Sequence, residues 1–326
     1  MRVRRASPYR RDPAVFNWNH LDLRPHARAP WVVDETLRDG LQSPSVVDPP
    51  LDRKIAILHA MVAVGVDVVS VGLPAAGKRA EDDAVALARE IATSHLPLVP
   101  TAAGRTTAGD VLAVARVSER AGTPVAVYAF VGSSPIRQYV EGWSVDFIVR
   151  CIRTATDTAR DAGLPLHVVL EDTTRTPPTT LATIFRAALD GGAAGLALCD
   201  TVGHASPDGA AALVTFARHQ LVALGGTHLE LDWHGHNDRG AALSNALAAA
   251  RAGVDRVHAT ALGIGERTGN VRMDHLLEGL CGSARPHPGP AALEAYNRLC
   301  ATALGWEIEV APAAPSVAPR PATACG

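Results

Sequence analysis

Two histidines separated by one residue, His234 and His236, form a candidate pair of metal ligands. Side chains at positions i and i+2 of an extended segment point to the same face, so both imidazoles can reach one ion. Two imidazoles need an anionic third ligand to hold a divalent ion, and Asp39 is a candidate for it. The alternative is that both histidines are ordinary loop or core residues. The spacing indicates a divalent metal site that Zn, Mn, Co or Mg could fill.

Polar side chains also follow several short apolar runs. Arg38 precedes Asp39, and it either forms an ordinary surface ion pair or, if Asp39 binds a metal, aims a permanent cation at an oxygen bound nearby. The glycines from Gly263 to Gly269 are spaced GxGxxxG, which is not the GxGxxG fingerprint of a dinucleotide-binding loop. The polar clusters are Asp34–Gly40, Glu171–Asp172, Asp200–Thr201, His234–Asp238 and Gly263–Asn270. In a parallel barrel the positions after the strands meet at one face, so we expect these clusters to build a single site.

From residue 31 the chain alternates β-branched runs with longer Ala-rich amphipathic stretches, a pattern typical of repeated βα units. The expected strands are Trp31–Asp34, Val66–Gly72, Leu96–Thr101, Val125–Val131, Leu166–Leu170, Gly195–Cys199, Leu229–Trp233 and Arg256–Ala261. The expected helices between them include Asp52–Val64, Asp82–Thr93, Val145–Ala162, Thr180–Leu189, Pro207–Leu224 and Ala241–Ala252. Strands spaced by roughly 30 residues favour a closed α/β fold, the (β/α)8 TIM barrel, over an open sheet.

Shorter segments flank the expected barrel. We divide the chain into an N-terminal arm (1–29), a barrel catalytic domain (30–285) and a helical extension with a Pro/Ala-rich tail (286–326). Helical patterns over Met273–Leu280 and Ala291–Leu304 precede the tail, which begins at Ala311. The arm is rich in Arg, as an organelle transit peptide would be, but its aspartates and prolines favour an arm lying on the barrel or on a partner subunit.

The composition limits the classes of partner. Lys and Arg number 31 against 33 Asp and Glu, so the net charge of −2 gives no electrostatic reason to expect binding to nucleic acid or to an anionic membrane. No apolar run approaches the ~20 residues that span a bilayer. The five cysteines are widely spaced and odd in number, which speaks against a disulfide framework. We expect a soluble cytoplasmic protein whose partners are small molecules or copies of itself.

Three motifs occur in order on the expected strand ends. They are Asp-Glu-Thr-Leu-Arg-Asp-Gly-Leu-Gln from Asp34, His-Gly-His-Asn-Asp from His234 and Gly-Glu-Arg-Thr-Gly-Asn from Gly265. Together they resemble the 2-isopropylmalate and homocitrate synthase family, and the resemblance covers about residues 31 to 280. It implies a metal-dependent Claisen-type condensation of acetyl-CoA with a small 2-oxo acid, giving a 2-substituted malate and CoA. It also implies a homodimer.

The resemblance implies roles for individual residues. The metal ligands it implies are Asp39, His234, His236 and, directly or through water, Asn270. The residues it places near the substrate or its protons are Arg38, Gln42, Ser134, Glu171, Arg175 and Thr201. Arg38 would polarise the ketone, and Thr201 would hold the carboxylate of the 2-oxo acid. The alternatives are that Thr201 only caps a strand end in solvent and that Glu171 and Arg175 form an ion pair at the barrel mouth.

The sequence departs from the family pattern in three places. The second strand carries Ser70 where the family usually has Glu, so one acid is missing. His167 stands where homocitrate synthases place an Arg that reads the distal carboxylate of 2-oxoglutarate, so we expect another substrate, either small or anionic enough for a His to meet. The synthases draw a His and a Tyr from a C-terminal subdomain, whereas this chain ends at Gly326. Glu171 and His167 are therefore the candidate bases inside the barrel, and feedback inhibition by leucine is not expected.

Two other functions compete with condensation. A lyase like 3-hydroxy-3-methylglutaryl-CoA lyase would run the carbon–carbon bond formation backwards on the same fold and metal site. Those lyases carry a Cys in the Gly-rich loop after the eighth strand, and Gly265–Asn270 has none. A non-catalytic metabolite-binding barrel is the second alternative, suggested by Ser70 and by the missing subdomain. The presence of Arg38, Asp39 and both histidines favours an enzyme.

Overall fold

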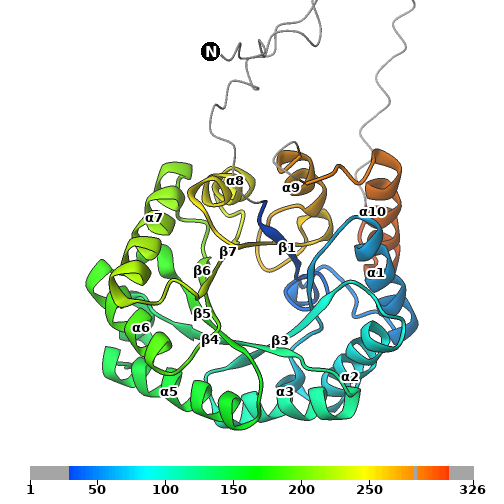
Figure 1. Cartoon of the computed structure of the whole chain (residues 1–326). Helices are drawn as coiled ribbons and strands as arrows, with labels where there is room; N and C mark the ends of the chain where they lie inside the picture. Colours follow the sequence, from blue (N-terminus) through cyan, green and yellow to red (C-terminus); the bar gives the residue numbers. More distant parts are fainter. Residues whose placement is uncertain (1–28, 282–284, 308–326) are drawn as a thin grey trace, which may run out of the picture.

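The computed structural model describes residues 29–281 and 285–307. All but the last residue of the expected N-terminal arm, and the whole Pro/Ala-rich tail, lie outside them. Eight parallel strands close into a barrel in chain order, with β1 paired to both β2 and β8 (Figure 1). The strands are β1 (Trp31–Asp34), β2 (Val68–Ser70), β3 (Val99–Arg105), β4 (Ala126–Gly132), β5 (Leu166–Glu171), β6 (Gly195–Asp200), β7 (Glu230–Gly235) and β8 (Arg256–Ala259). The expected TIM barrel is confirmed.

Helices form the outer ring of the barrel in Figure 1. They are α1 (Leu51–Ala63), α2 (Lys78–Thr93), α3 (Ala108–Ala121), α4 (Pro135–Glu141), α5 (Val145–Asp161), α6 (Pro178–Asp190), α7 (Pro207–Leu224), α8 (Ala242–Ala252), α9 (Met273–Gly279) and α10 (Pro290–Leu304). Local sequence sets several of their ends. The Ser206 hydroxyl accepts a hydrogen bond from the Gly209 amide at the start of α7, and Gly225 ends this helix with a φ of 76°.

The third strand differs from the expected one. It runs from Val99 to Arg105, whereas the β-branched pattern predicts Leu96–Thr101. Its second half, Ala102-Ala103-Gly104, has little intrinsic preference for a strand. It pairs residue by residue with β4, in the register Thr101 to Ala126 through Arg105 to Phe130. Pairing with the neighbouring strand therefore extends β3 beyond what its sequence predicts.

The helical extension packs against the barrel. α9 and α10 agree with the two expected helices to within one residue, and α10 lies beside α1 (Figure 1). The Tyr296 hydroxyl of α10 donates a hydrogen bond to Asp34 Oδ2 at the end of β1. The extension thus packs against the barrel beside β1 and α1. In the ranges 29–281 and 285–307, no helix combines the length and the apolar character that crossing a membrane requires.

The barrel interior is unusually polar. TIM barrels usually fill it with layers of branched apolar side chains. Here β4, β5, β7 and β8 bury Tyr128, His167, Asp232, Arg256 and His258. The Tyr128 hydroxyl donates to Asp232 Oδ2 (2.7 Å) and accepts from Arg256 Nη1 (2.9 Å), so these side chains meet across the barrel from strands that are not neighbours. A buried polar network therefore lies inside the barrel.

Candidate active site

A cavity of about 160 Å³ opens where the barrel strands end. Its lining residues are Glu35, Arg38, Asp39, Gln42, Ser70, Leu73, Ala103, Tyr128, Phe130, Val169, Glu171, Cys199, Thr201, His234, His236, His258 and Glu266. Four of the seven lining residues from β2 to β5 and their loops are apolar, namely Leu73, Ala103, Phe130 and Val169, whereas β1, β7, β8 and their loops contribute carboxylates and imidazoles. The cavity thus has an apolar wall and a wall of candidate ligands.

Asp39, His234 and His236 direct one ligand atom each at a common point. Nε2 of His234 lies 3.2 Å from Asp39 Oδ2, and Nε2 of His236 lies 3.7 Å from the same oxygen. The two imidazole nitrogens are 3.2 Å apart. Ligand atoms about 2.0–2.2 Å from a tetrahedral ion lie at similar distances from one another. The structure brings Asp39 next to His234 and His236, which lie far from it in the sequence. The geometry of the three ligand atoms fits a divalent ion.

Unpaired buried atoms support this fit. Asp39 Oδ1, His236 Nδ1 and Asn270 Oδ1 are buried and have no hydrogen-bond partner among the described residues. Burial raises the pKa of Asp39, but Arg38 and His234 outweigh burial and hold this pKa well below its ordinary value. Burial and the neighbouring His234 lower the pKa of His236 to about 4, so its ring is neutral at neutral pH. An ionised carboxylate and a neutral imidazole are the forms that bind a metal.

Asn270 lies next to this group. A β-carbon built on Gly265 would overlap Asn270 Nδ2 and lie 3.4 Å from Asp39 Oδ1, so the Gly265 position approaches both side chains closely. Asn270 also forms an antiparallel bridge with His236. The lack of a side chain at Gly265 leaves Asn270 room beside the three ligands.

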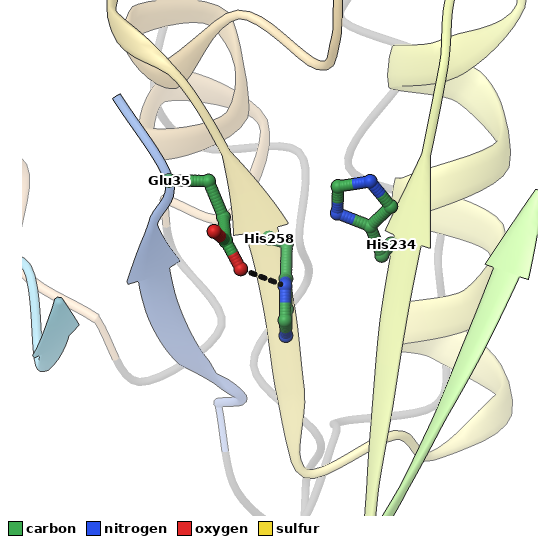
Figure 2. Close-up of side chains that lie close together, drawn as sticks. All are labelled: Glu35, His234 and His258. Carbon is green, nitrogen blue, oxygen red and sulfur yellow. Dashed lines mark hydrogen bonds and ion pairs between the residues drawn. The ribbon is translucent and has the colours of Figure 1, made fainter. Parts of the chain in front are cut away.

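Glu35, His234 and His258 form a second group within metal-binding reach (Figure 2). In this group Glu35 and His258 already form a hydrogen bond with each other, because Glu35 Oε1 lies 3.0 Å from His258 Nδ1. The other ring nitrogen, Nε2, lies 3.3 Å from Asp232 Oδ2. Burial lowers the pKa of His258, but its bonds to Asp232 and Glu35 outweigh burial and raise this pKa. A ring held between two carboxylates is better described as an imidazolium than as a metal ligand.

Arg38 lies between the two groups. Its Nε donates to Glu35 Oε2 (2.7 Å), Nη1 donates to Gln42 Oε1 (3.4 Å), and Nη2 lies 3.5 Å from Asp39 Oδ2. Burial lowers its pKa, but Glu35 and Asp39 outweigh burial and raise it. Arg38 is therefore a permanent cation at the cavity wall, next to the metal-binding group.

Glu171 and Thr201 line the cavity from the ends of β5 and β6. Burial raises the pKa of Glu171, and the nearest cation, Arg137 Nη2, is 3.7 Å away. A carboxylate with a raised pKa suits proton transfer near neutral pH. The Thr201 hydroxyl accepts a bond from the Asp172 amide (2.8 Å), which leaves the hydroxyl proton available to a ligand.

Four residues that the sequence predicts at the site do not line the cavity in the part of the chain that the structure describes. They are Asn270, which lies beside the metal-binding group, and His167, Arg175 and Ser134. His167 stacks on Tyr128, with ring centroids 4.7 Å apart, and accepts from Arg256 Nη1 (3.0 Å). It lies near the start of β5, too deep to meet a substrate at the strand ends. Arg175 is paired with the Asp172 carboxylate through Nε and Nη2, each at 2.7 Å. Their positions do not support the predicted roles of His167 as base and Arg175 as substrate ligand.

Ser134 is the last of these residues. It is fully buried, and its hydroxyl accepts a hydrogen bond from the Arg137 amide (3.2 Å) as the N-cap of α4. The Ser-Pro-Ile-Arg segment thus begins a helix, which the sequence patterns did not predict. A capping role explains Ser134 without contact to a substrate.

The sequence patterns predict no individual role for Glu35, Asp232 or His258. A signal for Asp232 and His258 is present, because polar residues alternate with apolar ones in Glu230–His236 and in Arg256–His258. This period of two marks the inward faces of β7 and β8. Glu35 also lines the cavity together with Ser70, so the cavity has an acid although β2 supplies none.

The HMGL-like family profile matches residues 29–285. The 2-isopropylmalate synthase of Acidimicrobium ferrooxidans is 32% identical over 252 residues, which are 76% of this chain and 46% of that protein. A putative (R)-citramalate synthase of Methanopyrus kandleri is 33% identical over 247 residues, with 76% and 46% covered. This chain therefore spans about half the length of these curated relatives.

Solved structures agree with the fold. The HMG-CoA lyase of Bacillus subtilis has a TM-score of 0.70 at 18% identity, covering 88% of this chain and 97% of that one. An HMG-CoA lyase from Acinetobacter baumannii, solved with coenzyme A and 3-methylmalate, has a TM-score of 0.69 at 19% identity, with 86% and 92% covered. At this level of identity the likeness concerns the barrel fold.

Proposed function

The chain belongs to the HMGL-like family, and from this membership and the site geometry we propose that it condenses an acyl-CoA, with acetyl-CoA as the expected donor, with a 2-oxo acid. One observation carries the proposal. Arg38 and the group Asp39, His234 and His236 lie together on one wall of a cavity whose other wall is apolar. A cation and a metal-binding group on the same wall suit the stabilisation of a negative oxygen that forms on a carbonyl.

The metal-binding group would consist of Asp39, His234, His236 and Asn270. A divalent ion held by them would supply Lewis-acid chemistry to a carbonyl oxygen. The chain's own contribution is to fix these ligands in the loop after β1, at the end of β7 and in the loop after β8, and to keep His236 neutral.

Arg38 would face the ketone oxygen of the 2-oxo acid. Negative charge develops on this oxygen when the enolate carbon of the acyl donor attacks the ketone carbon, and a fixed guanidinium lowers the energy of that charge. Gln42 bonds to Arg38 and would help to orient it. Thr201 would donate its free hydroxyl proton to the carboxylate of the 2-oxo acid.

Glu171 is the proposed base. The step needs a group that takes a proton from the carbon next to the thioester carbonyl, and Glu171 lines the cavity with a raised pKa. Water then cleaves the thioester, which releases CoA and leaves the malate carboxylate.

The apolar wall bears on the choice of 2-oxo acid. Leu73, Ala103, Phe130 and Val169 line it. The distal carboxylate of 2-oxoglutarate would lose its hydration there without gaining a cation. We therefore propose a 2-oxo acid with a short apolar side chain.

The test is release of free thiol from acetyl-CoA with a panel of 2-oxo acids, with and without added Mn or Zn. Pyruvate and 2-oxoisovalerate should give metal-dependent release, ahead of oxaloacetate, phosphonopyruvate and 2-oxoglutarate. The variant D39N should lose this release, whereas the conservative surface change Y139F should not. Metal-loaded protein that releases no thiol with any acid, but cleaves a 3-hydroxyacyl-CoA, would support a lyase instead.

A further inference from the structure

We propose that His258 and Asp232 are positioning residues, which hold Glu35 and, through Glu35, keep the Arg38 guanidinium at the cavity wall. The inference rests on the proposed function only for the part that concerns turnover. The part that concerns the placement of Arg38 follows from the contacts alone.

The contacts form one unbroken chain across the barrel. Asp232 Oδ2 lies 3.3 Å from His258 Nε2, and His258 Nδ1 lies 3.0 Å from Glu35 Oε1. Glu35 Oε2 accepts from Arg38 Nε at 2.7 Å. The far end is fixed as well, because Asp232 Oδ2 also accepts from the Tyr128 hydroxyl at 2.7 Å. Residues from β4, β7, β8 and the loop after β1 are thereby tied to one another.

Each link has a defined direction. Ionised carboxylates only accept hydrogen bonds, so both ring nitrogens of His258 donate, one to Asp232 and one to Glu35. This arrangement leaves Glu35 Oε2 free to face Arg38. Glu35, Asp232 and His258 are at most 3% exposed, so water does not compete for these bonds as it does at a surface.

The position of Arg38 needs such a restraint. Its Nη2 lies 3.5 Å from Asp39 Oδ2, and two opposite charges at that distance attract each other. Without Glu35 the guanidinium would move towards Asp39 and compete for the oxygen that a metal would use. Glu35 accepts from Arg38 Nε, which lies on the same edge of the guanidinium as Nη2, and so limits how far this edge can turn towards Asp39. His258 keeps Glu35 oriented for this task.

Simple core packing does not account for the chain. A buried set of two carboxylates and an imidazolium costs more to desolvate than the branched apolar side chains usual at these positions. A second metal site does not account for it either, because both nitrogens of His258 are engaged. A positioning role accounts for the bonds that join Asp232, His258, Glu35 and Arg38.

A double-mutant cycle tests the part that concerns turnover. H258Q should lower kcat by about 10–100-fold and change KM by less than about twofold. This is the range found when a group that orients a reacting or ligating side chain is lost. In an R38K background the same change should cost less than about threefold, because His258 acts through Arg38. D232N, which keeps the shape of the side chain, should behave like H258Q.

Two readouts separate positioning from a general loss of structure. Bound metal, measured by elemental analysis, should be the same in H258Q and in the wild type. T101V removes another buried hydroxyl of the barrel, which donates to Val69 O (3.3 Å) outside this chain, and it should leave kcat within about twofold. Equal losses from H258Q in both backgrounds, a loss of bound metal in H258Q, or unfolding of both H258Q and D232N would overturn the proposal.

The placement of Arg38 can be measured without turnover. In protein labelled with [15N]arginine, the Nε–H signal of Arg38, identified by its loss in R38K, should be protected from exchange by Glu35. H258Q and D232N should shift or broaden it, and T101V should not. An unchanged signal in H258Q refutes the positioning role. A shifted signal in a protein that releases no thiol with any acid would refute the proposed function and leave this inference standing.

Discussion

Replacing Tyr296 with Phe should destabilise the barrel where α10 meets β1. The Tyr296 hydroxyl donates to Asp34 Oδ2 and lies 3.3 Å from Thr36 Oγ1, and all three residues are buried. A hydrogen bond to a charged group contributes about 1.5–3 kcal/mol. We therefore expect Y296F to lower the free energy of unfolding by about 2 kcal/mol at pH 8, where Asp34 is ionised. For a domain of more than 250 residues this corresponds to a fall in Tm of about 3–4 °C.

The size of this effect should depend on pH. Burial raises the pKa of Asp34 from 3.8 to about 6, and the bonds from Thr36 and Tyr296 oppose the rise. Because folding raises this pKa, ionising Asp34 costs stability as the pH rises from 3.8 through about 6, and Tyr296 offsets part of the cost. Below pH 5 the carboxyl is largely protonated, and the bond contributes only the ~1 kcal/mol of a neutral pair. The deficit of Y296F should thus grow from pH 5 to pH 8.

Urea and thermal unfolding at both pH values would measure this deficit. Y139F is the matched control, because Tyr139 on α4 is 89% exposed and its hydroxyl has no hydrogen bond among the residues described. If Y296F unfolds like Y139F at pH 8, or if its deficit is larger at pH 5 than at pH 8, the role assigned to the Tyr296–Asp34 contact is wrong.

Three further predictions concern the cavity. Added Mn or Zn at about 100 times Kd should stabilise the wild type by about 2.7 kcal/mol in thermal unfolding but leave D39N unchanged; equal stabilisation of both would exclude Asp39 as a ligand. G265A should weaken metal binding about 10–100-fold in a chelator competition, because its β-carbon would overlap Asn270 Nδ2. The control is G109A, which has open space around the added β-carbon and should bind metal as the wild type does. Because burial raises the pKa of Glu171 and a base works when ionised, kcat/KM should rise with pH through a value above 4.5. E171Q should remove this rise and lower kcat about 100-fold or more. If E171Q keeps the rise of kcat/KM with pH, the titrating base is another group.

The proposed reaction extends beyond what family membership establishes. The match covers only 46% of each of these curated relatives, so their complete activities serve only as a guide to assays. The acetyl-CoA donor, the homodimer and the cytoplasmic location remain predictions, as do the bounds of the three expected domains.

The sequence by itself determined the barrel and one half of the candidate metal site. Strand and helix periods are local properties, so alternating β-branched and Ala-rich runs predicted the βα units without knowledge of the contacts between them. The spacing of His234 and His236 is local in the same way. Asp39 could be added because the ends of parallel strands always meet at one face of a barrel.

Tertiary structure alone decided which inward-facing residues meet and at what depth. Glu35 and His258 are 223 residues apart and touch because β1 pairs with β8, and the register of that pairing sets their height. The inward direction of His167 follows from its even spacing to Glu171, but its depth below the cavity follows from its position at the start of β5 and from its stacking on Tyr128. Local spacing fixes the side of a strand that a residue faces, whereas the partner that it meets depends on strand register and barrel closure, which the spacing does not encode.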